Sequence, residues 1–343
     1  MAPVTVRRST PADAAAIVRA LRRAEGTTYT GQWMYQSEQV ARAIAEERIV
    51  SWVVPGQSGD VLAHGALRFL AAGHGPGTPG AVEYGMVFTD PEHRGEGLAG
   101  RVGAEALHWA KSHRIAEVWM WATTQQPFAQ AAAARAGGTE MCLLLAMVPP
   151  GANRGFDATI AEPTAALLFV LRLEPAIETG TWYLPASTRR MVATLMAGSP
   201  VLVTPLAAAT EAADHHRGPD RARQAGSLSA DYVSELAFQV LEVVEPSPTC
   251  VAEAVRLTFA AAARGCHVTY LDLDPTSAAA MGLAEQFEEV GFAFAGIHPK
   301  YPEGRLRYRM QAVTSRLQPR ESIAVATERG RTLVDQVWAT LPG

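Results

Sequence analysis

The chain has 343 residues, with 30 Lys and Arg against 34 Asp and Glu and a formal net charge of −4. This balance gives no basic surface for nucleic acid, and no apolar run approaches the roughly 18–20 residues that span a bilayer. The N-terminal residues lack the apolar core of a signal peptide, and Cys142, Cys250 and Cys266 fall in apolar or helical surroundings. We therefore expect a cytoplasmic protein with reduced thiols, long enough for two domains.

The first 175 residues alternate short apolar runs with amphipathic stretches, which predicts an α/β domain. Strands are expected at residues 4–7, 49–54, 61–70, 82–88, 118–122, 141–148 and 165–173. Helices are expected at residues 10–23, 37–47, 98–110 and 126–136, with loops at 26–36 and 73–80.

The second half alternates in the same way after an expected linker at residues 175–183. Helices are expected at residues 186–196, 251–264, 277–290 and 323–341, and a polar, mobile stretch at 210–226. Strands are expected near residue 232 and at 237–244, 267–273, 292–297 and 306–311. This half is again of the α/β class.

One stretch, residues 81–100, carries the strongest functional signal. An apolar strand stops at Thr89-Asp90-Pro91, because proline cannot extend a central ladder, and Arg94-Gly95-Glu96-Gly97 then leads into a helical pattern. Glycines let a backbone approach a ligand closely, and the first N–H groups of a helix have no intrahelical acceptor. Together with the helix dipole, such a turn favours a phosphate or pyrophosphate. It is neither the dinucleotide-binding fingerprint nor a P-loop.

The turn resembles the R/Q-x-x-G-x-G/A signature of the GNAT superfamily of N-acyltransferases, filled here by Arg94, Gly97 and Ala99. The resemblance covers residues 1–175 and implies the GNAT fold, a mixed central sheet flanked by helices. It implies that the turn holds the pyrophosphate of acetyl-CoA or another acyl-CoA and that the strand backbone holds the pantetheine, with no metal. The implied donor-binding residues are Met86, Val87, Phe88, Arg94, Gly95, Glu96, Gly97, Leu98, Ala99 and Gln126.

The second half resembles a degenerate GNAT-like domain, expected at residues 183–343. Gly291-Phe292 after a helix is similar to the end of a GNAT domain. However, no R-x-x-G-x-G/A turn occurs after residue 175. The resemblance therefore implies a second domain without a donor site.

Acyl transfer to an amine requires a base for the amine's proton. By the resemblance, Glu83 on the central strand takes this role, although it could equally be an exposed carboxylate in an ion pair. His64, on a neighbouring strand, is a second candidate base or a hydrogen-bonded core histidine. Tyr84 is a candidate proton donor, but strand alternation places it on the face opposite Glu83.

Tyr29, Trp33 and Tyr35 lie in the loop that, by the resemblance, lines the acceptor side. They would suit a flat or amphipathic amine, or they pack between the first two helices. The expected acceptor is a small molecule of bacterial secondary metabolism or an antibiotic, and the chain is expected to be a monomer or homodimer.

Two departures from the family pattern leave alternatives open. The position where many GNAT enzymes carry a tyrosine that protonates the leaving thiolate is Ala133, so Tyr84 or water replaces it, or the thiolate leaves unassisted. This loss also fits a non-catalytic acyl-CoA-binding module.

The second departure is Glu96, a carboxylate in the turn that opposes the phosphates of CoA. It favours a phosphopantetheine donor tethered to a carrier protein as an alternative. An alternating strand with Arg305, Arg307 and Arg309 on one face could bind such an acidic partner, or it is a solvated sheet face.

Overall fold

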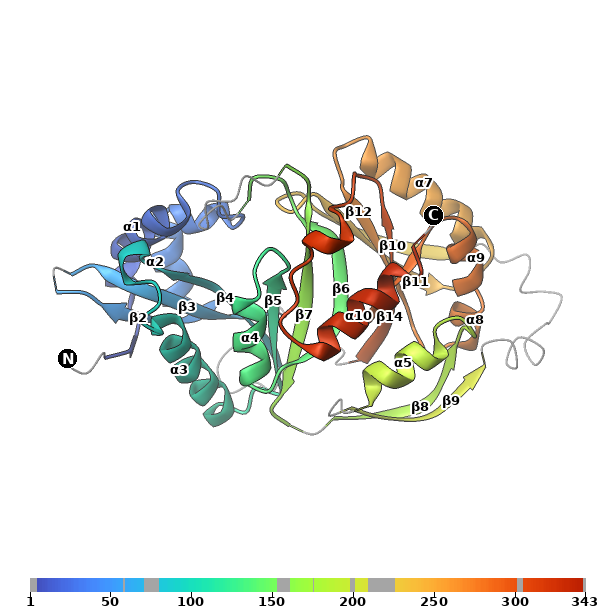
Figure 1. The fold of residues 1–343 in the computed structure, drawn as a ribbon, viewed down its shortest axis with the longest axis horizontal. Coiled ribbons are helices and arrows are strands. Elements are labelled where there is room, and N and C mark those ends of the chain that lie inside the picture. Colours follow the sequence, from blue (N-terminus) through green and yellow to red (C-terminus); the bar gives the residue numbers. More distant parts are fainter. Residues whose placement is uncertain are drawn as a thin grey trace. The chain divides into compact units, whose positions relative to one another are not determined.

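The computed structural model describes residues 5–57, 59–70, 80–152, 161–174, 176–197, 201–208, 226–300 and 305–341. The chain divides into two compact units, and Figure 1 traces its course. The first unit runs as far as Trp121 and includes Val170–Glu174, and the second contains Ala122–Pro150, Glu162–Phe169 and the C-terminal half. Residues 122–150, expected in the first domain, thus pack with the second unit. The expected loop at 73–80 and polar stretch at 210–226 fall almost wholly outside the described residues.

A mixed sheet forms the centre of the first unit. Its strand order is β1-β2-β3-β4-β5, with β4 and β5 parallel and the other neighbouring pairs antiparallel. The bounds are β1 Arg7–Arg8, β2 Ile49–Pro55, β3 Val61–Phe69, β4 Ala81–Thr89 and β5 Glu117–Thr123. The expected mixed α/β sheet is confirmed here.

Helices cover both faces of this sheet (Figure 1). Helices α1 (Ala14–Glu25) and α2 (Ser37–Ala45) pack on one face, and α3 (Leu98–Ser112) packs on the other. Ile17 and Leu21 of α1 are fully buried, because they recur on one side of the helix at its 3.6-residue period. Short 3₁₀ turns stand at η1 (Pro11–Asp13), η2 (Gln32–Tyr35) and η3 (Pro91–His93), the second of them inside the expected loop at 26–36.

In the second unit neighbouring strands follow the order β7-β6-β13-β14-β12-β11-β10. Strands β8 and β9 form a separate two-stranded parallel sheet. The strands are β6 Thr139–Val148, β7 Thr164–Arg172, β8 Ala176–Leu184, β9 Val201–Ala208, β10 Ser227–Val233, β11 Phe238–Glu245, β12 Val268–Leu273, β13 Ala293–Lys300 and β14 Arg305–Val313. The helices are α4 Phe128–Arg135, α5 Arg189–Met196, α7 Thr249–Ala262, α8 Ala278–Met281, α9 Ala284–Glu289, η5 Arg320–Ser322 and α10 Glu328–Trp338.

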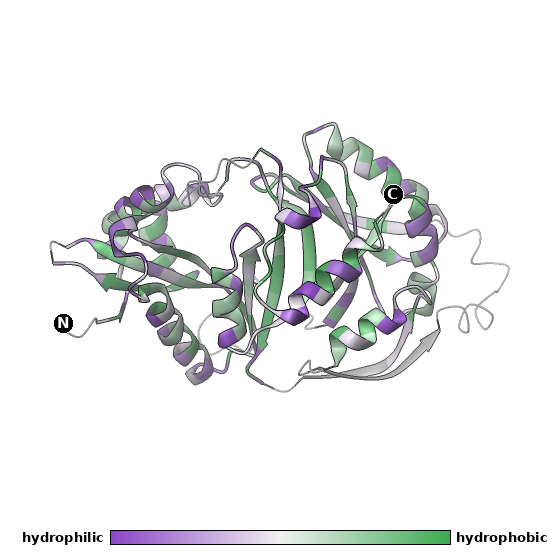
Figure 2. Cartoon of the chain, viewed as in Figure 1, coloured by the Kyte–Doolittle hydropathy of each residue, from purple (hydrophilic) through white to green (hydrophobic). Residues whose placement is uncertain are grey.

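Burial of β6 and β7 explains their sequences. Nearly every residue of both strands is buried, so they are apolar along their length instead of alternating, and Figure 2 shows both in the colour of hydrophobic residues. Cys142 on β6, with Cys250 and Cys266, is a buried free thiol, which confirms the expectation for the cysteines. None of the helices within the described ranges is long and apolar enough to cross a membrane.

The linker expected at residues 175–183 is wrong. This segment forms β8, which pairs in parallel with β9 from Ala176↔Val201 to Leu184↔Ala208, and Trp182 and Leu184 are fully buried. Pro175 suggested a linker, but the residues after it include Ile177, Thr179, Thr181 and Tyr183, which suit a pleated surface. The segment forms a strand because β9 supplies its hydrogen-bonding partner, and the sequence did not predict β9.

Two expected helices are shorter than their sequence patterns. The one at 277–290 splits into α8 and α9 at Gly282 and Leu283, because glycine weakens a helix interior. The one at 323–341 begins only at Glu328, where Thr327 caps it by accepting from the Gly330 N–H at 2.9 Å. Before that point Ala324 donates to the carbonyl of Thr124 at 2.7 Å, so the backbone there is bonded elsewhere.

Candidate active site

Strand β4 separates from β5 beyond Glu83. The two strands pair from Ala81↔Glu117 to Glu83↔Trp119, and no later pair joins them among the residues that the structure describes. On its other side β4 carries a bulge, because Ala66 pairs with Gly85 but His64 pairs with Phe88. Met86 lies in the bulge with φ of 55°. Such a bulge bends the strand and leaves backbone groups without ladder partners, so the expected pantetheine-binding segment has an open edge.

The bulge also changes which side chains of β4 share a face. Val82 and Tyr84 pack in the core under α3, so Glu83 points to the opposite face. Simple alternation would then continue with residues 85 and 87. Instead Met86 and Phe88 pack in the core under α1 and α2, because the extra residue reverses the alternation. Glu83, Met86 and Phe88 therefore lie on one face.

His64 holds the bulge from strand β3. Its Nδ1 lies 2.8 Å from the carbonyl oxygen of Met86, and because a carbonyl only accepts, Nδ1 donates. Its ring stacks on Phe88 at a centroid distance of 5.0 Å. Burial lowers the pKa of His64 to about 4, so the ring is neutral at pH 7. This arrangement has the contacts of the hydrogen-bonded core histidine, and its role as base stays a prediction.

The glycine turn between β4 and α3 has the backbone that phosphate binding requires. Gly95 and Gly97 have φ of 85° and 74°, and a Cβ built at either would meet nothing within 4 Å. Gly97 is the N-cap of α3, and no side chain caps the helix there. The first N–H groups of α3 are therefore left without a side-chain acceptor, beside open space.

The charged side chains of this turn have protein partners. Arg94 donates through Nη2 to the carbonyl of Ala24, at the end of α1, at 3.3 Å. His93 Nδ1 lies 3.1 Å from a carboxylate oxygen of Glu96. The backbone of Gly95–Leu98 is thus the best-defined donor element of the turn, and the roles of the Arg94 and Glu96 side chains stay predictions.

Glu83 forms an ion pair with Arg68, which lies directly opposite it on β3. The Glu83 side chain is 18% exposed and that of Arg68 52%, so the pair is open to solvent on one side. Sequence analysis anticipated an ion pair for Glu83 but not its partner. Arg68 could be identified as the partner only from the pairing register of β3 with β4. The sequence does not give this register, because β4 contains a bulge and a long connection joins the two strands.

Tyr29 packs against the core under α1 and α2, which includes Met86 and Phe88 on the Glu83 face of the sheet. Burial, followed by the charge of Glu83, raises the pKa of Tyr29. Trp33 and Tyr35 pack against the core under α1 and α2, and the Tyr35 hydroxyl accepts from the Tyr29 N–H at 3.0 Å. All three aromatic residues thus have packing contacts with this core, and the acceptor-binding role of each stays a prediction.

Tyr84 lies on the other face, as alternation predicts. A Cβ at Gly65 or Gly103 would lie 2.8 or 3.2 Å from its hydroxyl, which places that hydroxyl between β3 and α3. The hydroxyl is buried without a hydrogen-bond partner, and burial raises the pKa of Tyr84. The Tyr84 hydroxyl therefore lies on the opposite face of the sheet from the Glu83 and Met86 side chains.

Gln126 and Ala133 belong to the second unit. The amide oxygen of Gln126 is buried without a hydrogen-bond partner, and Ala133 is buried on α4. Within the described part of the chain, no group of three or more His, Cys, Asp or Glu side chains could hold a metal ion.

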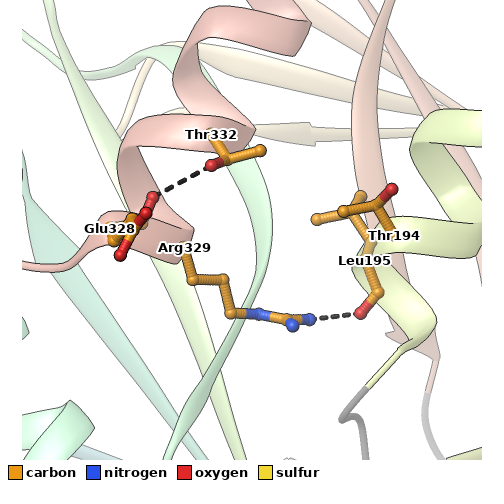
Figure 3. A pocket seen from close by; sticks show the side chains of 5 residues that line it. All are labelled: Thr194, Leu195, Glu328, Arg329 and Thr332. Atoms are coloured by element: carbon orange, nitrogen blue, oxygen red, sulfur yellow. Dashed lines mark hydrogen bonds between the residues drawn. The ribbon is translucent and has the colours of Figure 1, made fainter.

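A pocket of about 300 Å³ lies in the second unit, between α5 and α10 (Figure 3). One of its two charged side chains, Arg329, donates to the carbonyls of Leu195 and, at 3.0 Å, Ala197. Arg329 thus satisfies carbonyls at the C-terminal end of α5. Figure 3 also shows Thr332 donating to the backbone carbonyl of Glu328, at the N-terminal end of α10. The hydrogen bonds of this pocket are thus those of two helix ends.

Residues 18–137 match the model of the acetyltransferase (GNAT) family. This segment, about a third of the chain, contains the bulge, the turn and Glu83. A search of curated proteins finds no match.

Solved structures similar to the chain include several acetyltransferases. A putative acetyltransferase from Salmonella typhimurium, solved with its cofactor acetyl-CoA, is 14% identical with a TM-score of 0.42, covering 52% of this chain and 98% of that chain. The ribosomal-protein-S5-alanine acetyltransferase from Vibrio fischeri is 12% identical (TM-score 0.40, 49% and 92%). A phosphinothricin acetyltransferase from Sinorhizobium meliloti is 14% identical (TM-score 0.41, 50% and 90%).

Proposed function

We propose that this chain is an N-acyltransferase that moves an acyl group from acetyl-CoA or another acyl-CoA to the amine of a small molecule. The observation that carries the proposal is a single continuous element. Strand β4 leaves β5, bulges at Met86 and runs through the Gly95–Gly97 turn into an uncapped helix, α3. The family match over residues 18–137 supports the same activity.

The donor fits this element by its chemistry. A pyrophosphate is an acceptor of backbone N–H bonds, and the uncapped start of α3 supplies donors with the favourable end of the helix dipole. A pantetheine arm carries amide groups, which the unpaired edge of β4 at Met86, Val87 and Phe88 can bind as a strand would. The ligand would then lie along β4 and point its thioester back toward Glu83.

Glu83 is proposed to take the proton of the attacking amine, directly or through water. Arg68 pairs with the carboxylate and fixes its direction on the open face of the hairpin. The amine nitrogen then attacks the thioester carbonyl, the bond from carbon to sulfur breaks, and the thiolate takes a proton. Tyr29 packs on the Glu83 side of the sheet, whereas the Tyr84 hydroxyl lies between β3 and α3, so Tyr29 is the better-placed candidate proton donor.

The second half is proposed to be a GNAT-like domain that binds no donor. It repeats the strand pattern of the first unit, since β10 pairs antiparallel with β11 and β11 pairs parallel with β12 across α7. However, β11 and β12 stay paired as far as Glu242↔Asp272, and only residues 246–248, two of them proline, connect β11 to α7.

Ion pairs connect strands β11, β12, β13 and β14 where β11 and β12 are still paired. Asp272 on β12 accepts from Arg309 on β14 at 2.6 and 2.7 Å. Glu242 on β11 accepts from Lys300 at 2.6 Å and from Arg307 at 3.2 Å. Arg307 and Arg309 are buried, so the prediction of a solvated arginine face on this strand is wrong for these two residues.

Because the second half is proposed to bind no donor, we expect one acetyl-CoA per chain.

A donor tethered to a carrier protein is the second candidate, and Glu96 favours it. The turn contains two carboxylates, Glu92 and Glu96, and the Glu96 carboxylate faces His93. Only one phosphate accompanies a tethered phosphopantetheine arm, so this charge opposes it less than it opposes CoA. A non-catalytic acyl-CoA-binding module is the third candidate, supported by the alanine at position 133.

Two measurements test the proposal. Calorimetry with acetyl-CoA should give micromolar binding with one site per chain, and free thiol should appear when a panel of small amines is added. Glu83→Gln should lower kcat by about 10² to 10⁴, the usual contribution of a general base, and leave the Kd of acetyl-CoA unchanged. Binding without thiol release would select the non-catalytic module, and binding of phosphopantetheine but not acetyl-CoA would select the carrier-protein donor.

A further inference from the structure

The segment that begins the donor turn is attached to the last turn of helix α1 at two points. Arg23 Nε donates to Asp90 Oδ2 at 2.6 Å, and Arg94 Nη2 donates to the carbonyl of Ala24 at 3.3 Å. Arg23 also donates to the carbonyl of Val61 at 3.2 Å, on strand β3. Two consecutive residues of α1 therefore hold the two ends of the segment from Asp90 to Arg94.

Asp90 shapes this segment with every polar group it has. Its other carboxylate oxygen accepts from the N–H of Glu92 at 3.2 Å, its own N–H donates to Leu62 at 2.8 Å, and its carbonyl accepts from His93 at 2.9 Å. Asp90 is buried, with 6% of its surface exposed. Burial has the largest single effect on the pKa of Asp90 and raises it, but the hydrogen bonds from Arg23 and the Glu92 N–H and the charges of Arg23 and His93 together lower it. Arg23 thus compensates a buried charge that would otherwise be costly.

The same end of α1 leads into the acceptor side of the site. The helix ends at Glu25, Gly26 reverses the chain with φ of 61°, and Tyr29 then packs against the core that contains Met86 and Phe88 of β4. A shift of this helix end relative to β4 would therefore move the donor turn and the acceptor segment together. Neither Arg23 nor Asp90 belongs to the glycine motif.

We propose that Arg23 is a positioning residue, which through Asp90 holds the donor turn in its binding geometry before the donor arrives. The inference rests on the proposed function, because it assumes that the turn binds acyl-CoA. A misplacement of about 1 Å at such a site can cost about 10²-fold. An ordinary structural ion pair would lower stability and leave the affinity of the folded protein unchanged.

The test uses the full chain and calorimetry with acetyl-CoA, at a temperature at which each variant is folded. Arg23→Ala should raise the Kd about 10- to 100-fold, and Arg23→Lys should recover part of the loss, because lysine keeps the charge without the guanidinium geometry. Asp90→Asn keeps an oxygen for the Glu92 N–H and should weaken binding similarly. The double variant should bind about as weakly as either single variant, because the two residues act through one contact.

Arg19→Ala is the matched control. Arg19 lies one turn earlier on α1 and pairs with Asp60 at 3.8 Å, with 54% of its side chain exposed, so its removal should change the Kd less than twofold. Equal loss of affinity in Arg19→Ala, or a Kd of Arg23→Ala within twofold of the wild type, would overturn the inference.

Hydrogen exchange without ligand separates this inference from the proposed function. The N–H groups of His93 and Arg94 donate to Asp90 and Pro91, so a peptide covering residues 88–97 should exchange faster in Arg23→Ala but not in Arg19→Ala. Unchanged exchange there would overturn the positioning role. Failure of the wild-type chain to bind acetyl-CoA would instead overturn the proposed function.

Discussion

Replacement of His64 by glutamine tests whether the bulge of β4 is held by a neutral, buried histidine. Glutamine keeps an amide N–H that can donate to the Met86 carbonyl, but it does not titrate. In the folded chain burial lowers the pKa of His64 from 6.5 to about 4. Between these pH values the unfolded chain binds a proton at His64 and the folded chain does not.

The sign and size of the effect follow from this difference. The stability that neutral His64 contributes is fully present above pH 6.5 and is lost as the pH falls toward 4, by about 3 kcal/mol in total. Near pH 5 the slope is about 1 kcal/mol per pH unit. His64 is completely buried, so solvent does not screen this effect.

The assay is the free energy of opening of the first unit, measured by hydrogen exchange of peptides from β2 and β3 between pH 7.5 and 4.5. Wild-type chain should lose about 2.5 kcal/mol more than His64→Gln over this range. The control is His108→Gln, an exposed histidine on α3, whose profile should match that of the wild type. Parallel profiles for wild type and His64→Gln would refute the assignment of a neutral buried ring.

Two further predictions concern the turn and the second unit. Glu96→Gln should lower the Kd of acetyl-CoA severalfold at low salt, because it removes a carboxylate from the phosphate-binding turn; calorimetry at two salt concentrations checks this, with Glu105→Gln as an exposed control on α3, and weaker binding would contradict it. Gly296→Ala should destabilise the second unit by at least about 3 kcal/mol, because φ is 137° and the new Cβ would lie 2.2 Å from the Met141 carbonyl oxygen. Thermal unfolding measures the loss, and a melting temperature like that of Gly100→Ala, a helical glycine with nothing within 4 Å, would show the reasoning to be wrong.

The sequence alone identified the parts of this protein whose signals are local. The stop at Asp90-Pro91, the glycines of the turn and the periodicity of α3 together specify a strand, a turn and a helix, because each depends on neighbouring residues. The buried β6 and β7 were visible as apolar runs for the same reason. Alternation along β4 correctly separated Glu83 from Tyr84, because adjacent residues of a strand point to opposite faces of the sheet.

Contacts between distant residues were decided only by the tertiary structure. The bulge at Met86 depends on the pairing of β3 with β4, and it reverses an alternation that the sequence predicts to continue. Arg68 beside Glu83 follows from the same register. Arg23 and Asp90 are 67 residues apart in the chain, and β8 became a strand because β9 supplies its partner. No local pattern encodes which distant residue will supply a charge or a hydrogen-bond partner, because that choice is made by packing.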